Sequence, residues 1–362
     1  MHDMLSLVQR SLVHSRKRGL LTAALAACVF FLAISHSAVA QVPLLHHGEV
    51  VPRDVREMYD RGLQYLANKQ TENGDWSDGQ NGPGTTGMAL MAFMASGEDP
   101  NFGRYRNHVR RALRSIISAQ DISTGYMGPS MYHHGFAMLA LAEAYGAVDD
   151  RDLWPAGQSL NRRPIGAALE LAVRAAVTSQ KKNPLDAWRY SPDATDADTS
   201  VSGAVLVGLL AARNAGIEVP DTSIEKAINY YESMTSNSGQ VAYSGIGGFG
   251  ESTARTSIAT LVYALARRAD LPQYKATLGS LTQQPEQESS PYLEYGRYYQ
   301  AQALFQGNIA AWEKWNKQLI RQLKASQQDD GSFSGQFGQS VGTSLSLLAL
   351  ALNYRLLPIY ER

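Results

Sequence analysis

The segment from Thr195 to Ser200 carries the two acidic residues best placed for acid–base chemistry. Asp196 and Asp198 are separated by one residue and stand directly before an apolar, helix-like run. Two neighbouring carboxyl groups can share a proton, which raises the pKa of one of them and makes it a general acid. A carboxylate at a helix N-terminus also caps free amides and favours the positive end of the helix dipole. The segment therefore predicts either a general acid or a simple N-cap.

Two adjacent histidines, His133 and His134, stand at the start of another apolar run. One imidazole could face a cavity as an acid, a base or a ligand, since its pKa lies near neutral pH. The alternative is a polar residue satisfied by hydrogen bonds at a helix start. A metal site needs further ligands, and Cys28 is the one cysteine of the chain. We therefore expect no cysteine-ligated zinc, no other metal and no cofactor.

Polar and aromatic residues also precede or open the later apolar runs. Glu251 and Arg255 stand four apart, which favours an ion pair within one helix. Tyr295 and Tyr299 belong to an aromatic cluster that is typical of a core as well as of a cavity wall. Together with the aspartates and histidines above, these residues fall at matching places in successive segments. That placement predicts a pocket at one end of the fold. No nucleophile elbow, phosphate loop or dinucleotide fingerprint occurs in the chain.

Two kinds of segment alternate along the chain and must position these residues. The first kind is amphipathic, with apolar residues at three- and four-residue spacing, and predicts helices buried on one face. Its segments are Arg53–Gln70, Arg104–Gln120, Pro164–Gln180, Thr222–Met234, Leu271–Gln283 and Asn308–Gln327. The second kind is small and apolar all round and predicts helices surrounded by protein. Its segments are Thr86–Ser96, Gly135–Gly146, Ser200–Ala215, Thr256–Ala266, Gly296–Phe305 and Thr343–Leu352.

A sequence motif of the form Gln-x-x-x-Gly-x-aromatic, here called the repeated phrase, ends the first and the last amphipathic segments. A period of about 50 residues with weaker copies between them indicates a helical-hairpin repeat. The aromatic side chains could offer π surfaces to a cation. The structural interpretation is that Gln caps a helix end, Gly permits a sharp turn and the aromatic ring packs on the next repeat. The phrase consists of Gln70, Gly74 and Trp76, and again of Gln327, Gly331 and Phe333.

These features resemble the prenyltransferase and squalene-oxidase repeat family of the terpenoid-cyclase and protein-prenyltransferase superfamily. The resemblance rests on the repeated phrase, MYHHGFAMLALAEAYG, DADTSVSGAVLVGLLAARNAGI and YRLLPIY, and covers residues 54–362. It implies an all-α fold, an α/α toroid in which about six helical hairpins form a closed double ring. Squalene-type cyclases carry a general acid in an Asp-x-Asp-Asp motif, and this chain has one carboxylate too few. The zinc site of protein prenyltransferases needs a cysteine that the mature chain lacks.

Composition narrows the class of protein further. The chain is 44% hydrophobic with a formal net charge of +0, which excludes an intrinsically disordered protein and argues against a nucleic-acid binder. One basic segment, Arg104–Arg114, is the local exception. These arginines are expected to form a solvated helix face, and the alternative is that they bind an anionic partner or a membrane surface.

The N-terminus has the pattern of an export signal. A basic flank, Arg16–Arg18, precedes a short apolar run, and Ala38-Val39-Ala40 offers a cleavage site. We expect residues 1–40 to be a signal peptide, 41–53 a linker and 54–362 the toroid, exported to the periplasm or cell envelope. Lipidation at Cys28 and retention as an uncleaved anchor are the alternatives.

Two functions fit these features. One is a binding or scaffold module that uses its central cavity or rim for an apolar small molecule or an envelope protein. The other is a terpenoid-cyclase-like lyase or isomerase that acts on an isoprenoid or similar apolar substrate with Asp198 as general acid. Fold alone does not decide between them, because function depends on the site.

Overall fold

The computed structural model describes residues 51–154, 162–245, 248–283, 290 and 292–360. The chain divides into two units, Met1–Val50 and Val51–Arg362. The expected signal peptide (1–40) and all but the end of the expected linker (41–53) lie outside the described residues. Regular structure in the described part of the second unit consists of twelve α-helices and one short 3-10 helix. None of these helices has the length and apolar character needed to cross a membrane.

Helices of two kinds alternate along the chain. The even-numbered helices are α2 (Arg53–Lys69), α4 (Arg106–Ser118), α6 (Ile165–Lys182), α8 (Asp221–Ser233), α10 (Pro272–Gln283) and α12 (Ile309–Ser326). The odd-numbered helices are α3 (Pro83–Met94), α5 (Met131–Ala144), α7 (Thr199–Asn214), α9 (Thr253–Leu265), α11 (Leu293–Gly307) and α13 (Gln339–Ala351).

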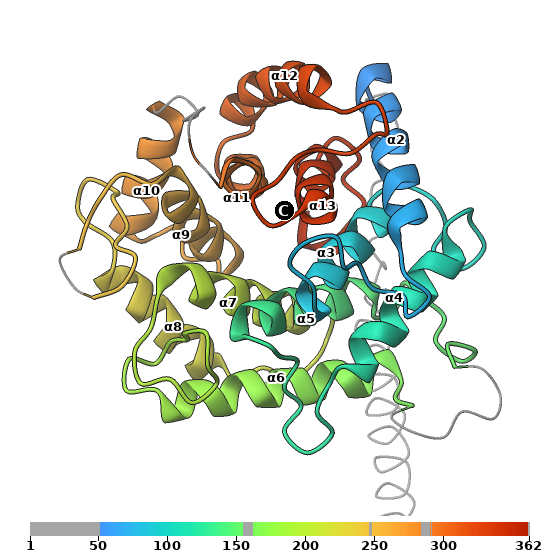
Figure 1. Ribbon diagram of the computed structural model, residues 1–362. Coiled ribbons are helices and arrows are strands. Elements are labelled where there is room, and N and C mark those ends of the chain that lie inside the picture. The colour runs from blue at the N-terminus through green and yellow to red at the C-terminus, as the bar shows by residue number, and fades with distance from the viewer. Residues whose placement is uncertain (1–50, 155–161, 246–247, 284–289, 291, 361–362) are drawn as a thin grey trace, which may run out of the picture. The chain divides into compact units, whose positions relative to one another are not determined.

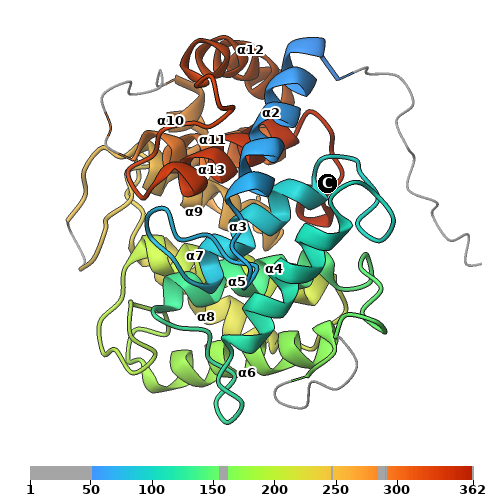
Figure 2. The ribbon, with the colours of Figure 1, turned by 45° about the vertical axis from the view of Figure 1, so that its right-hand side comes forward.

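The odd-numbered helices form a closed inner ring. Each one packs against the preceding and the following inner helix, and α13 packs against α3, so the ring has no free end. The even-numbered helices lie outside this ring and pack against the inner helices next to them (Figures 1 and 2). The predicted all-α fold, an α/α toroid with a closed double ring of six hairpins, is confirmed.

Burial explains the difference between the two sets of helices. Every residue of α3 is buried, because protein surrounds an inner helix on all sides. In α4 only one face is buried, with Val109, Leu113 and Ile116 among its members. Small residues let inner helices approach closely. A Cβ atom built on Gly135 of α5 would lie 2.6 Å from the carbonyl carbon of Ala204 in α7, so only glycine fits there.

The glutamine of the repeated phrase joins neighbouring repeats. The Gln70 side-chain amide donates to the carbonyl oxygens of Gly74, in its own turn, and His108, in the next outer helix, at 3.0 Å each. Gln120 and Gln180 each make the same pair of bonds, to their own turns and to the next outer helices. Each amide therefore satisfies a carbonyl at a helix end and one on its neighbour.

The glycine of the phrase is required by both conformation and space. Gly74 has φ 87°, and a Cβ atom there would lie 2.3 Å from the carbonyl oxygen of Arg111. The aromatic residue completes the turn, since the indole N–H of Trp76 donates to the carbonyl of Leu66 at 2.9 Å. These contacts give the phrase a structural role outside the inner ring.

The last copy of the phrase closes the ring on the first helix. The Gln327 amide donates to the carbonyl oxygen of Met58 in α2 at 2.8 Å. A Cβ atom on Gly331 would lie 2.4 Å from the carbonyl oxygen of Arg61, also in α2. The last repeat thus binds the first helix as the repeats of Gln70, Gln120 and Gln180 bind the outer helices that follow them.

The C-terminal segment packs at the end of the ring where the inner helices finish. It includes η1 (Pro358–Tyr360), and Leu357 and Ile359 are buried. The Ile359 N–H donates to Glu143, near the end of α5, at 3.4 Å. The Ile359 carbonyl accepts from Gln306, near the end of α11. This segment covers one end of the ring, which leaves the opposite end for a cavity.

Candidate functional site

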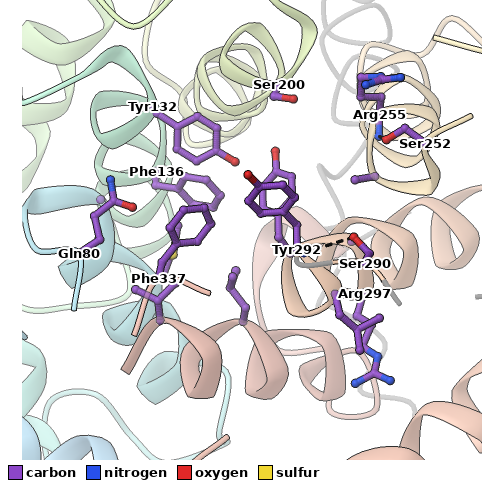
Figure 3. A pocket seen from close by; sticks show the side chains of 18 of the residues that line it. Gln80, Tyr132, Phe136, Ser200, Ser252, Arg255, Ser290, Tyr292, Arg297 and Phe337 are labelled. Atoms are coloured by element: carbon purple, nitrogen blue, oxygen red, sulfur yellow. Dashed lines mark hydrogen bonds between the residues drawn. The ribbon is translucent and has the colours of Figure 1, made fainter. Parts of the chain in front are cut away.

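The beginnings of the six inner helices surround a cavity of about 820 Å³, here called the central cavity. Its walls come from the first turns of α3, α5, α7, α9, α11 and α13 and from the loops that precede them. The N-termini of all six inner helices therefore meet at one place, and the polar residues that precede them are brought together. Figure 3 shows part of this wall.

The wall of the central cavity is largely aromatic, with polar groups between the rings. The aromatic residues that line it are Tyr132, Phe136, Tyr190, Tyr243, Tyr292, Tyr295 and Phe337. The rings of Tyr292 and Phe337 stack with centroids 5.8 Å apart. The hydroxyl groups of Tyr190 and Tyr243 lie 3.1 Å apart on another part of the wall. Such surfaces favour an apolar or aromatic ligand.

The deepest lining residues are mostly apolar. Met88, Phe136 and Leu345 each stand about one helical turn deeper than the first lining residues of their helices. Gln300 holds the corresponding position in α11. The base of the central cavity is therefore apolar apart from one amide.

Tyr295 lines the central cavity, whereas Tyr299 lies behind the wall. The Tyr295 ring packs against Tyr132 and Tyr299 at centroid distances of 6.0 and 4.9 Å. Burial raises the pKa of both Tyr295 and Tyr299, so both hydroxyls stay protonated at neutral pH. Tyr299 belongs to the packed core and is not a cavity-lining residue.

The two histidines point in different directions because adjacent helical residues are about 100° apart. His133 lines the central cavity, and its Nδ1 accepts the N–H of Gly84 at 3.3 Å. His134 is fully buried between backbone groups instead. Its Nδ1 accepts the N–H of Met127 at 3.1 Å, and its Nε2–H donates to the carbonyl of Ala172 at 3.0 Å.

Burial lowers the pKa of His134 to about 4, so the imidazole is neutral at physiological pH. Both ring nitrogens are occupied by the backbone, and the residue does not reach the central cavity. The structure thus places His134 as a polar residue satisfied by hydrogen bonds, away from the central cavity.

Asp198 is the N-cap of α7. Its Oδ1 accepts the N–H of Val201 at 2.8 Å, while its Oδ2 is buried without a hydrogen bond. Burial raises the pKa of Asp198 to about 6, against the lowering effects of the Val201 N–H and the Arg189 guanidinium. Asp198 is 0% exposed and does not line the central cavity, although Ser200, two residues further on, does.

Asp196 does not share a proton with Asp198, because Arg189 lies between them. One guanidinium nitrogen of Arg189 is 3.5 Å from Asp196 Oδ2 and another is 3.5 Å from Asp198 Oδ2. The Asp196 side chain is largely exposed to solvent outside the central cavity. The raised pKa of Asp198 thus has burial as its main cause, with the charge of Asp196 a minor one.

Glu251 and Arg255 both line the central cavity, but the predicted ion pair between them is absent from the described contacts. The Arg255 guanidinium instead donates to the carbonyl oxygens of Val241 at 2.8 Å and Gly250 at 3.1 Å. Arg297 donates to Gln322 at 3.0 Å. Figure 3 shows both guanidinium groups directed away from the aromatic centre of the cavity.

Several lining residues were missed by sequence reasoning. Tyr190, Tyr243 and Phe337 lie in loops, whose paths a helical pattern does not determine. Gln300 had a detectable signal, because it is polar within an inner helix expected to be apolar on all sides. Within the described ranges, no group of three or more His, Cys, Asp or Glu side chains is placed to hold a metal ion.

No family model matches the chain, and no curated protein matches it. Solved structures are similar in fold. An inactive variant of an α-1,6-mannanase from Salegentibacter sp. HEL1_6, in complex with α-1,6-mannotriose, has TM-score 0.64 and 10% identity, with 83% of this chain and 99% of that chain covered. A family 76 glycoside hydrolase (mannosidase) from Bacteroides thetaiotaomicron has TM-score 0.59 and 11% identity, with 83% and 98% covered.

A type II terpene cyclase from Scytonema, in complex with its substrate geranylgeranyl dihydroxybenzoate, is similar too. Its TM-score is 0.58 and its identity 13%, with 84% of this chain and 98% of that chain covered. At these identities the likeness establishes the α/α toroid fold and leaves the chemistry to be argued from the central cavity.

Proposed function

We propose that this protein is a binding toroid of the cell envelope that holds an apolar or aromatic small molecule in its central cavity. The observation that carries this proposal is the cavity itself. Its volume of about 820 Å³ falls in the range of roughly 300–1,000 Å³ typical of ligand sites. Aromatic rings from α5, α11 and four loops line it, and the inner ring of helices holds them in place.

The small number of carboxylates in the described cavity wall favours ligand binding over glycoside hydrolysis as the function. Glycoside hydrolysis commonly needs two carboxyl groups that flank the scissile bond. Among the described residues that line the cavity, Glu251 is the one carboxylate. The mannanase chemistry of the structurally similar proteins therefore has no counterpart in the described wall.

The envelope location belongs to the proposal and rests on the N-terminal sequence. The basic flank, the short apolar run and the small residues at Ala38–Ala40 support export and cleavage before Gln41.

The binding proposal is tested with a neutral fluorescent probe, N-phenyl-1-naphthylamine. We expect one saturable site per chain. Gly296 lines the cavity, and a Cβ atom built there meets no heavy atom within 4 Å. Gly296→Phe should therefore place a ring in the open space beside this residue and weaken probe binding. Gly279 in the outer helix α10 has equally open surroundings, so Gly279→Phe should leave binding unchanged.

Equal probe binding by the wild type and the Gly296→Phe variant would show that the probe binds elsewhere. That outcome, or no binding by the wild type, contradicts the proposed use of the central cavity.

The second candidate function is a terpenoid-cyclase-like enzyme, and the environment of Asp198 favours it. A buried carboxyl group with a pKa of about 6 and an oxygen without a hydrogen bond has an acidity suited to general acid catalysis, although the Asp198 side chain does not line the central cavity. Incubation with squalene or another isoprenoid should then give a cyclised product. Asp198→Asn should lower the turnover about a hundredfold or more. Without such a product, the binding function remains the better explanation.

A further inference from the structure

The base of the central cavity contains an amide group whose bonding the protein leaves incomplete. Gln300 is 1% exposed and lines the cavity. Its side chain has no hydrogen bond among the described contacts. Gln302, two residues further along α11, is buried to a similar degree, but its amide donates to the carbonyl of Tyr298 at 3.3 Å. The two residues show that α11 can satisfy a buried glutamine, and that Gln300 is left for the cavity.

A purely apolar molecule at the base of the cavity would leave the Gln300 amide without a hydrogen bond, and this is energetically unfavourable. Met88, Phe136 and Leu345 are the deepest lining residues of α3, α5 and α13, and none of them can hydrogen-bond through its side chain as an amide does. An apolar ligand would remove water from the Gln300 amide and supply no partner. A ligand with an oxygen at its buried end would restore the hydrogen bond.

The charges around the cavity favour a neutral oxygen group. An anion at the base would lie among apolar side chains without a counter-charge, which is unfavourable. The lining arginines, Arg255 and Arg297, stand near the starts of α9 and α11. Their guanidinium groups donate to Val241, Gly250 and Gln322 and point away from the centre of the cavity. The two arginines therefore do not supply a positive counter-charge for an anion at the base of the cavity.

We propose that Gln300 determines ligand specificity, and that the ligand is a mainly apolar or aromatic molecule with a neutral carbonyl or hydroxyl oxygen at its buried end. This inference rests on the proposed binding function and narrows the class of ligand. The expected ligand is therefore not purely apolar but has one polar end. The Gln300 amide can donate to a carbonyl and can also accept from a hydroxyl.

The test compares three naphthalene probes of nearly equal size by equilibrium dialysis against the full-length protein. 2-Acetylnaphthalene carries a ketone, 2-ethylnaphthalene carries no polar group and 2-naphthoate carries a charge. We expect the wild type to bind the ketone about tenfold more tightly than the hydrocarbon, and the naphthoate most weakly. In Gln300→Met, which keeps the size of the side chain, the preference for the ketone should disappear. Gln302→Met is the matched control in the same helix and should keep it.

The outcomes separate this inference from the function on which it rests. Ketone and hydrocarbon bound equally by the wild type, or a preference that survives Gln300→Met, would overturn the role of Gln300 and leave the binding function standing. Tightest binding of the naphthoate would overturn the neutral oxygen group. Failure of all three probes to bind, together with N-phenyl-1-naphthylamine, would overturn the binding function itself.

Discussion

At the scale of the single residue, Asp198 combines a helix cap with burial. Its Oδ1 accepts the Val201 N–H, as an N-cap requires. Its Oδ2 has no hydrogen bond, and Arg189 approaches no closer than 3.5 Å. Burial without full compensation disfavours the charged form, so the folded protein holds the proton of Asp198 more tightly than the unfolded chain does. The pH dependence of stability follows from this difference.

The pKa of Asp198 is about 6 in the folded protein, against an ordinary value of 3.8. Between these values the folded state binds more protons than the unfolded state, so the stability that Asp198 contributes is complete below pH 3.8 and is lost as the pH rises to 6. The loss is on the order of 3 kcal/mol. Asp198→Asn keeps the cap without the charge. Urea unfolding should show similar stability of the two proteins at pH 4 and a more stable variant at pH 7.

Exposed Asp193, which pairs with Lys182 at the surface, provides the control. Asp193→Asn should change the free energy of unfolding by less than about 1 kcal/mol at either pH. If Asp198→Asn is less stable than the wild type at pH 7, the Asp198 carboxylate is stabilised by contacts stronger than those described, and the burial argument fails.

Single side-chain directions were harder to predict from the sequence than the positions of the helices. His133 and His134 are adjacent, yet one lines the central cavity and the other bonds to Ala172 in the neighbouring outer helix. The sequence placed both at a helix start but contained no information on the rotation of that helix. Asp198 was equally ambiguous, because a capping carboxylate and a catalytic one occupy the same position.

At the scale of the elements, periodicity predicted all twelve helices to within a few residues at most ends. The predicted segment Ser200–Ala215 corresponds to α7 (Thr199–Asn214), and Arg53–Gln70 corresponds to α2 (Arg53–Lys69). Helices fully surrounded by protein and helices buried on one face differ in composition, so the two rings were visible in the sequence. The loops that bring Tyr190 and Tyr243 to the cavity have no such periodicity, and their paths could not be predicted.

The turn of the repeated phrase allows a prediction about its glycine. Gly331 has φ 90°, and a Cβ atom there would lie 2.4 Å from the carbonyl oxygen of Arg61. Gly331→Ala should therefore add a steric clash with α2 to the strain of a left-handed alanine. We expect a loss of about 3 kcal/mol or more in the free energy of unfolding, measured by urea titration.

Gly216 distinguishes the effect of backbone strain from that of the steric clash. It has φ 89°, but a Cβ atom there meets nothing within 4 Å. Gly216→Ala should cost about 1 kcal/mol, from backbone strain alone. Equal losses in the two variants would show that the close approach to the neighbouring helix contributes little to stability.

At the scale of the whole fold, closure of the ring gives the central cavity its wall. The last repeat contributes Phe337, Val341 and Leu345 to the cavity, and the first inner helix contributes Met88 beside them. An open arrangement would expose the apolar faces of α3 and α11 where α13 now packs. The contacts of α13 with α3 and α11 therefore support both the stability of the fold and ligand binding. Loss of ring closure would remove a packing partner of these helices and part of the wall of the central cavity.

Deletion of Ser326–Arg362 removes α13 and the Gln327–Met58 bond that joins the last repeat to α2. The apolar faces left on α3 and α11 should abolish the single cooperative unfolding transition and the binding of N-phenyl-1-naphthylamine. A chain that ends at Asn353 keeps α13 and the contacts between α13 and α3, so it should still unfold in one transition at a lower temperature. Calorimetry and probe titration measure both properties. A protein shortened at Ser326 that melts in one sharp transition would show that the remaining helices are stable without closure, and that the interface between the first and last repeats is not essential to the fold.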